Sequence, residues 1–178
     1  MALHQKTHDP SDLVDALEHV VYEIWKYKQS VAHYFEICAA GGDAAIEFRV
    51  LHHRILLEFF YEPPKHKDNI GACEYIEDWK CTHNRANLKW FKDYMTRCHT
   101  MLAHVSRARS EIAKRGQKAW DKEWQIVEPH LDETVRDFLG RLSAEHKQTC
   151  LEWIRRWSGG NYPGSDVLPT LIALIGQP

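Results

Sequence analysis

Arg97 and His104 are the residues of this sequence best suited to chemistry, because they stand seven positions apart in one continuous stretch. On a helix, at about 100° and 1.5 Å per residue, they point the same way and lie roughly two turns apart. Arginine binds phosphate and stabilises developing negative charge, and histidine transfers protons near neutral pH. Two such pairs facing each other across a dimer axis could hold a ribose 2′-hydroxyl and its phosphate. The pair therefore predicts metal-independent RNA cleavage that needs no cofactor.

The helix that carries this pair is predicted over residues 87–108. Its apolar residues recur at alternating spacings of three and four, which is the pattern of one buried helical face. They are Leu88, Phe91, Met95, Cys98, Leu102 and Val105. A second edge, beside Arg97 and His104, carries Trp90, Tyr94, Met101 and Ala108. Since exposed apolar edges usually mark contacts, we expect a homodimer whose interface includes this edge.

The same helix and the stretch after it also predict contacts with RNA. Trp90 and Tyr94 could stack on unpaired bases, and His99 and Met101 are expected in the same binding surface. A basic cluster that could track phosphates follows. It consists of Arg107, Arg109, Lys114, Arg115 and Lys118. The alternative is a solvated helix end, where cations favour the negative end of the helix dipole.

Other residue sets offer competing sites. The residues of one possible zinc site are His66, Cys73, Cys81 and His83. Their spacing matches no common zinc finger, so a packed cluster under a loop is the alternative. Histidines on different predicted helices could instead hold a metal, as in DinB-like bundles. They are His19, His52 or His53, and His99 or His104. Otherwise one residue of the run 52–54 is hydrogen-bonded at the core edge and the other two are exposed.

An all-α chain with an Arg-x4–6-His motif on a late helix resembles the HEPN superfamily, and residues 97–104 fit that spacing. Residues 48–61 are similar to the second bundle helix of HEPN-like proteins. In that superfamily the arginine is usually followed by Asn, Asp or His, whereas here Cys98 follows it. A second match, from Arg141 to His146, straddles a predicted helix start at Ser143.

The resemblance implies a homodimeric ribonuclease of toxin or defence type, with a neutralising protein partner. Two alternatives stay open: a non-catalytic HEPN-like module that binds a protein or RNA, and a DinB-like metal-dependent enzyme.

The whole chain sets the remaining limits. Its 178 residues, with 44% hydrophobic and 27% charged side chains, suit one globular domain. The formal net charge of −2 gives no overall attraction to polyanions. Five cysteines without a Cys-x-x-Cys pattern predict reduced thiols and a cytoplasmic protein. The N-terminus has no apolar signal core, and no stretch approaches the roughly twenty apolar residues of a membrane span, so no membrane partner is expected.

The elements that would position these residues are all predicted to be helical, in an up-and-down bundle of four main helices. Asp9 and Pro10 begin a long helix that Gly41 and Gly42 end. The next helix, which Asp43 caps and Pro63 and Pro64 stop, should bury Phe48, Leu51, Ile55, Leu56, Phe59 and Phe60. Further helices are expected over 120–142, with a kink or break at Pro129, over 143–157, and over 167–175 behind an Asp166 cap. Residues 9–157 form the predicted bundle domain, and 158–178 form a loop and a short apolar helix on it.

Overall fold

The computed structural model describes residues 8–41, 43–64, 66, 69–79, 89–103, 121–160 and 165–176. His104, Arg107 and Ala108 lie outside these ranges, as do Cys81 and His83, and the side chain of Met101 is not described either. The predictions that depend on these residues therefore stay predictions.

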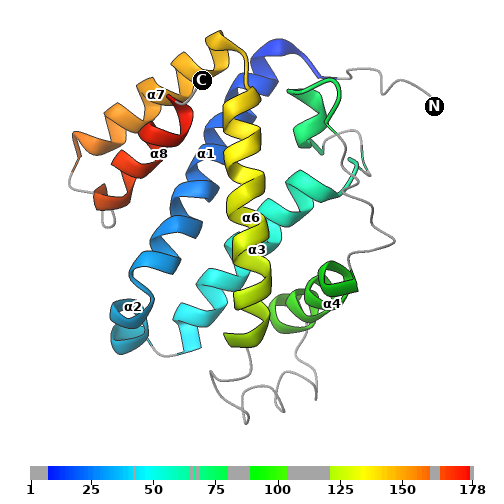
Figure 1. The fold of residues 1–178 in the computed structure, drawn as a ribbon, viewed down its shortest axis with the longest axis vertical. Coiled ribbons are helices and arrows are strands. Elements are labelled where there is room, and N and C mark those ends of the chain that lie inside the picture. Colours follow the sequence, from blue (N-terminus) through cyan, green and yellow to red (C-terminus); the bar gives the residue numbers. More distant parts are fainter. Residues whose placement is uncertain are drawn as a thin grey trace.

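Every regular element in the described ranges is a helix, which confirms the all-α fold (Figure 1). The elements are α1 (Pro10–Ala32), α2 (Tyr34–Gly41), α3 (Asp43–Tyr61), η1 (Ala72–Glu74), α4 (Lys89–Ala103), α6 (Asp121–Arg141), α7 (Ala144–Ser158), η4 (Ser165–Val167) and α8 (Leu168–Ile175). In Figure 1, α6 crosses in front of α3, α4 lies beside the lower part of α6, and α7 and α8 lie on the opposite side of the molecule. Within these ranges, no helix has both the length and the apolar character needed to cross a membrane.

The start of α1 follows the sequence prediction, but its end does not. The Asp9 carboxylate accepts a hydrogen bond from the Ser11 amide at 2.9 Å, and Pro10 occupies the first turn. The helix predicted to continue to Gly41 instead breaks at His33, whose backbone leaves the helical region at φ −108° and ψ 22°. The His33 ring lies 2.9 Å from a Glu36 oxygen and 2.8 Å from an Asp166 oxygen. Since Asp166 lies in the 3-10 turn η4, His33 connects the end of α1 to that turn.

The central helix of the fold is α3, which contacts α1, α2, α4, α6 and η1. Its buried residues are Ala45, Ile46, Arg49, Val50, His52, His53, Leu56, Leu57, Phe59, Phe60 and Tyr61. The predicted stripe was therefore wrong in its first half, since Leu51 is 40% exposed and Phe48 and Ile55 are half-buried. The prediction failed because the buried face of α3 includes two polar residues, Arg49 and His53, and the prediction used the spacing of apolar residues only.

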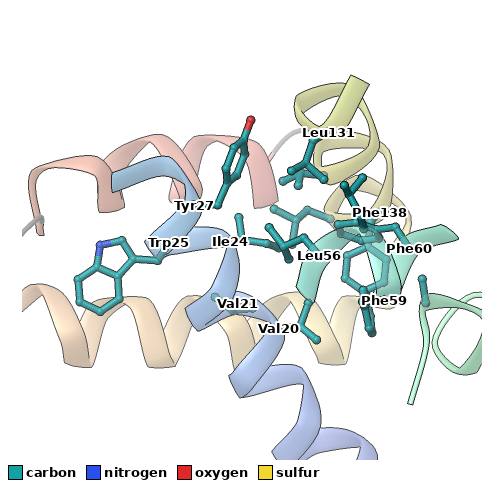
Figure 2. Close-up of a cluster of buried hydrophobic side chains, with 14 of the residues drawn as sticks. Val20, Val21, Ile24, Trp25, Tyr27, Leu56, Phe59, Phe60, Leu131 and Phe138 are labelled. Atoms are coloured by element: carbon teal, nitrogen blue, oxygen red, sulfur yellow. The ribbon is translucent and has the colours of Figure 1, made fainter. Parts of the chain in front are cut away.

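The hydrophobic core lies where α1, α3 and α6 meet (Figure 2). The Phe138 ring contacts Phe59 and Phe60 edge-on, each with a centroid distance of 5.3 Å. Residues 70–79 hold a single 3-10 turn, η1. Trp79 from this segment caps the core, and its indole N–H donates to the Phe60 carbonyl at 2.9 Å.

The C-terminal helices complete the core. Helix α6 continues through Pro129, so it does not break there, and the alternative, a kink at Pro129, stays a prediction. Ser143 caps α7 as predicted, because its hydroxyl accepts a hydrogen bond from the His146 amide at 3.1 Å. Helix α8 begins at Leu168 with Val167 as its cap, whereas Asp166 binds His33 instead of capping the helix. Helix α8 buries Leu168, Leu171 and Ile175, and it contacts α6 and α7.

Candidate functional site

The helix expected to carry the chemistry is α4, and it forms one wall of the candidate site. Phe91, Met95 and Cys98 are buried, as the spacing of apolar residues predicted. They pack in the same core cluster as residues of α3 and α6, the two helices that α4 contacts. Helix α4 is thus a side helix rather than the centre of the bundle.

A pocket of about 470 Å³ opens between α4 and α6. Its lining residues are Trp90, Asp93, Tyr94 and Arg97 from α4 and Glu123, Ile126 and Val127 from α6. Three residues that the sequence placed in one site, Trp90, Tyr94 and Arg97, therefore do line one pocket. Ile126 is 48% exposed at this pocket, so part of the apolar lining faces solvent.

Arg97 is ion-paired across the pocket. Its guanidinium donates a hydrogen bond to a carboxylate oxygen of Glu123 on α6. Both side chains are partly exposed, so solvent reaches the pair. A phosphate that bound Arg97 would have to compete with this carboxylate.

Trp90 is also engaged within the chain. Its indole stacks on the His130 ring with a centroid distance of 5.1 Å and an interplanar angle of 5°. One face of the indole is therefore covered, and the Tyr61 and Phe91 rings meet it edge-on at 6.5 Å and 6.0 Å. A nucleobase could stack on Trp90 only from the other face.

Tyr94 is buried, which corrects the expectation of an exposed second edge at this position. Only 2% of its surface is accessible, and its hydroxyl lies 2.7 Å from His53 Nδ1. Burial raises the pKa of the Tyr94 phenol well above its usual value, so this phenol stays protonated. Tyr94 therefore closes the floor of the pocket and connects it to α3.

His99 lies away from this pocket. Its Nε2 is 3.8 Å from a Glu58 oxygen of α3, and nearly half of its side chain is exposed. The ring thus faces the α3 side of α4, whereas Arg97 faces α6. Arg97 and His99 do not form one binding surface.

Behind Tyr94 lies a buried polar centre that the sequence reasoning did not assemble. Arg49 donates to a carboxylate oxygen of Glu128, and its guanidinium carbon lies 4.2 Å from the Trp124 centroid and 4.8 Å from the Tyr34 centroid. His53, which is fully buried, has its Nε2 3.6 Å from the same Glu128 carboxylate. Burial raises the pKa of Glu128, although Arg49 opposes this shift.

The polar centre continues toward α1. The Tyr27 hydroxyl donates to an Asp132 carboxylate oxygen, which also accepts from Lys28 Nζ at 2.7 Å. Burial, followed by the nearby Arg49 charge, lowers the pKa of His53 well below its usual value. Within the part of the chain that is described, Arg49 Nε and His53 Nε2 have no hydrogen-bond partner. The one signal for this centre was the spacing of Arg49 and His53 on α3 and of Glu128 and Asp132 on α6, since side chains four residues apart share a helix face.

The residues considered for metal sites do not come together where they are described. His52 and His53 are both buried, whereas only one of the run 52–54 was expected to lie at the core edge. His52 Nδ1 lies 2.5 Å from a Glu23 oxygen, and His53 pairs with Tyr94. No group of three or more His, Cys, Asp or Glu side chains in the described ranges is arranged to hold a metal ion.

Comparison with known proteins gives no family for this chain: no family model, no curated protein and no solved structure matches it.

Proposed function

We propose that this chain is a helical binding module, similar to HEPN proteins in its organisation, that pairs with a second copy through the pocket between α4 and α6. The observation that carries the proposal is the Arg97–Glu123 ion pair. The arginine that a ribonuclease would need for phosphate is already neutralised, and the walls beside it are mainly apolar. Such a pocket suits a protein surface better than a polyanion.

The occupant that we propose is a second copy, because the pocket holds an exposed carboxylate, Asp93, beside the Arg97–Glu123 pair. Asp93 and Arg97 stand four residues apart on α4, and both line the pocket. If two α4 helices cross in antiparallel orientation on a two-fold axis, each Asp93 faces the Arg97–Glu123 pair of the other copy, and the Arg97 guanidinium, which has five N–H donors, can bond both carboxylates. The exposed part of Ile126 adds apolar area beside these charges.

Sedimentation equilibrium on the full chain tests this proposal. We expect a dimer at micromolar concentration, and we expect Asp93→Arg to weaken it by placing two like charges opposite each other. Asp93→Asn, which removes the charge without adding an opposing one, should weaken the dimer less than Asp93→Arg. Lys92→Glu, an exposed change on α4 outside the pocket lining, is the control and should leave the dimer intact. A parent chain that is monomeric at tens of micromolar would overturn the proposal.

Metal-independent RNA cleavage is the second candidate function. The observation that favours it is that Arg97 lines a pocket reached by solvent, beside Trp90. In this candidate His104 acts as acid or base, and a neutralising protein partner would mask the site. Because general acid–base help is worth about 10²–10⁴ in rate, His104→Ala should lower cleavage by that order in EDTA, whereas His146→Ala should change little. A parent chain that cleaves no RNA, or a His104→Ala variant with full activity, would exclude it.

A further inference from the structure

The helix break at His33 places an imidazole between two carboxylates from distant parts of the sequence. The ring Nδ1 lies 2.9 Å from a Glu36 oxygen of α2, and the ring Nε2 lies 2.8 Å from an Asp166 oxygen of η4. Glu36 follows His33 by three residues, whereas Asp166 follows it by 133. One side chain therefore joins the end of α1, the first turn of α2 and the C-terminal turn.

The two contacts of this ring can both be hydrogen bonds only when the ring is protonated. A neutral imidazole has one N–H donor, and its other nitrogen is an acceptor. An ionised carboxylate is an acceptor only, so the nitrogen without a proton would face an oxygen that cannot donate to it. The imidazolium donates from both nitrogens, and its charge is opposite to that of the two carboxylates. The observed geometry thus suits the charged form of His33.

The surroundings of the ring also favour the charged form. The His33 side chain is 25% exposed, and those of Glu36 and Asp166 are 80% and 61% exposed, so burial opposes the charge only weakly. Within the described ranges, neither carboxylate has a lysine or arginine partner that could compete with His33. The hydrogen bond to Glu36, followed by the one to Asp166, raises the pKa of His33 above its usual value.

We infer that His33 is a pH-dependent clasp that holds η4 against the junction of α1 and α2. The protonated ring bonds both carboxylates and fixes the turn to the junction. Loss of the proton removes one donor and the attraction to both carboxylates, so the turn is held less firmly. Because the pKa of His33 is raised by folding, the clasp is closed at pH 6.5 and opens as the pH rises through the pKa of the folded state.

The opening is local, because the elements on either side of the clasp have other anchors. The start of α2 is held by Tyr34, which is buried against the Trp124 ring at a centroid distance of 5.2 Å. Helix α8 is held by Leu168, Leu171 and Ile175, which are buried in the core. The clasp therefore controls the mobility of η4 without controlling the fold. None of its residues lines the α4/α6 pocket, so the inference goes beyond the proposed function.

NMR of the imidazole nitrogens measures the ionisation of His33 directly. His33→Gln identifies its signals among those of the twelve histidines. We expect a pKa above the usual value of about 6.5 in the parent chain, and a lower pKa in both Glu36→Gln and Asp166→Asn. Asp15→Asn is the matched control, because it removes an exposed carboxylate on α1 that lies eighteen residues, or about 27 Å of helix, before His33. It should leave the pKa of His33 unchanged.

Hydrogen exchange measured by mass spectrometry, corrected for the intrinsic effect of pH on exchange, tests whether the ring holds η4. In the parent chain, protection of peptides from η4 should fall about twofold to fivefold between pH 6 and pH 8.5, since an exposed ion pair contributes little. His33→Gln, which is never charged, should show the lower protection at both pH values. His33→Arg, which is charged at both and has five N–H donors, should keep the higher protection. Peptides from α6 are the internal reference and should not change.

The inference is overturned if the pKa of His33 is at or below its usual value, or if neither Glu36→Gln nor Asp166→Asn lowers it. An equal decrease in Asp15→Asn would also overturn it, since the effect would then come from net charge. Protection of η4 that does not change with pH in the parent, or that changes equally in His33→Gln, would show that the ring does not hold the turn. Circular dichroism confirms that each variant is folded before these measurements.

Discussion

Replacing Arg49 by methionine should destabilise the chain strongly, because it leaves a charge in the interior without its partner. The side chains of Arg49 and Glu128 are only 8% and 18% exposed, and the guanidinium bonds the carboxylate directly. Breaking a buried pair of this kind by removing one partner costs about 3–5 kcal/mol. The methionine keeps most of the apolar contact with Trp124, so the loss reports mainly the stranded Glu128 charge.

The double variant separates the charge from the packing. Replacing Arg49 by methionine and Glu128 by glutamine together removes both charges, and such replacements are often close to neutral. We therefore expect the double variant to be more stable than Arg49→Met alone, with a coupling energy within the usual range of about 0.5–3 kcal/mol. The pair Arg54 and Glu58 is the matched control, because it is a more exposed pair four residues apart on α3 and should be worth about 0.3–0.5 kcal/mol.

Urea unfolding at pH 7, followed by tryptophan fluorescence and far-ultraviolet circular dichroism, measures these free energies. Coincident transitions in the two signals support two-state analysis. If Arg49→Met costs less than about 1 kcal/mol, or if the double variant is as unstable as the single one, then the guanidinium and the carboxylate are not a desolvated pair and the reasoning fails.

Three further predictions follow from the same interior. Phe59→Ala should cost about 3–5 kcal/mol of unfolding free energy in urea, because it leaves a cavity against Phe138; a loss under about 1 kcal/mol would contradict the packing. The lowered pKa of His53 means that the folded state holds this residue neutral, so its contribution to stability should be complete above about pH 6.5 and should fall below that pH, where the unfolded chain takes up a proton. His53→Gln should therefore reduce the change in urea midpoint between pH 7.5 and 5.5. A variant whose urea midpoint changes with pH as much as that of the parent would refute this. Burial raises the pKa of the Cys98 and Cys150 thiols to about 12, so mass spectrometry should find iodoacetamide on both only after unfolding; rapid labelling of the folded chain would show that they are accessible.

Signals that act within a few residues predicted local structure well. The Asp9 carboxylate and the Ser143 hydroxyl each accept a backbone hydrogen bond at a helix start, as their positions before helical segments indicated. The spacing of Phe91, Met95 and Cys98 identified the buried face of α4 because no polar residue interrupts it. The break at His33 was not predicted, and the ring of His33 there contacts Asp166, a partner 133 residues away in the sequence.

Long-range pairing also explains why the buried stripe of α3 was misplaced. On α3 the buried stripe includes Arg49 and His53, which are buried because α6 supplies Glu128 and α4 supplies Tyr94. Neither partner can be identified from the sequence of α3 alone. The spacing of apolar residues alone therefore placed the stripe on Phe48 and Leu51, which are half-buried and exposed.

The rotation of α3 about its axis determines which of its side chains are buried. It places Arg49 and His53 inside, and it leaves Phe48 half-buried and Leu51 exposed. Rotating the helix to bury Phe48 and Leu51 would expose Val50 and Leu57 and separate Arg49 from Glu128. The observed rotation instead closes the Arg49 ion pair and brings His53 to Tyr94, which also lines the α4/α6 pocket. The buried polar pairs thus select one orientation of α3, which leaves Leu51 exposed and Phe48 half-buried, and which fixes Tyr94, and with it one wall of the α4/α6 pocket, to the core.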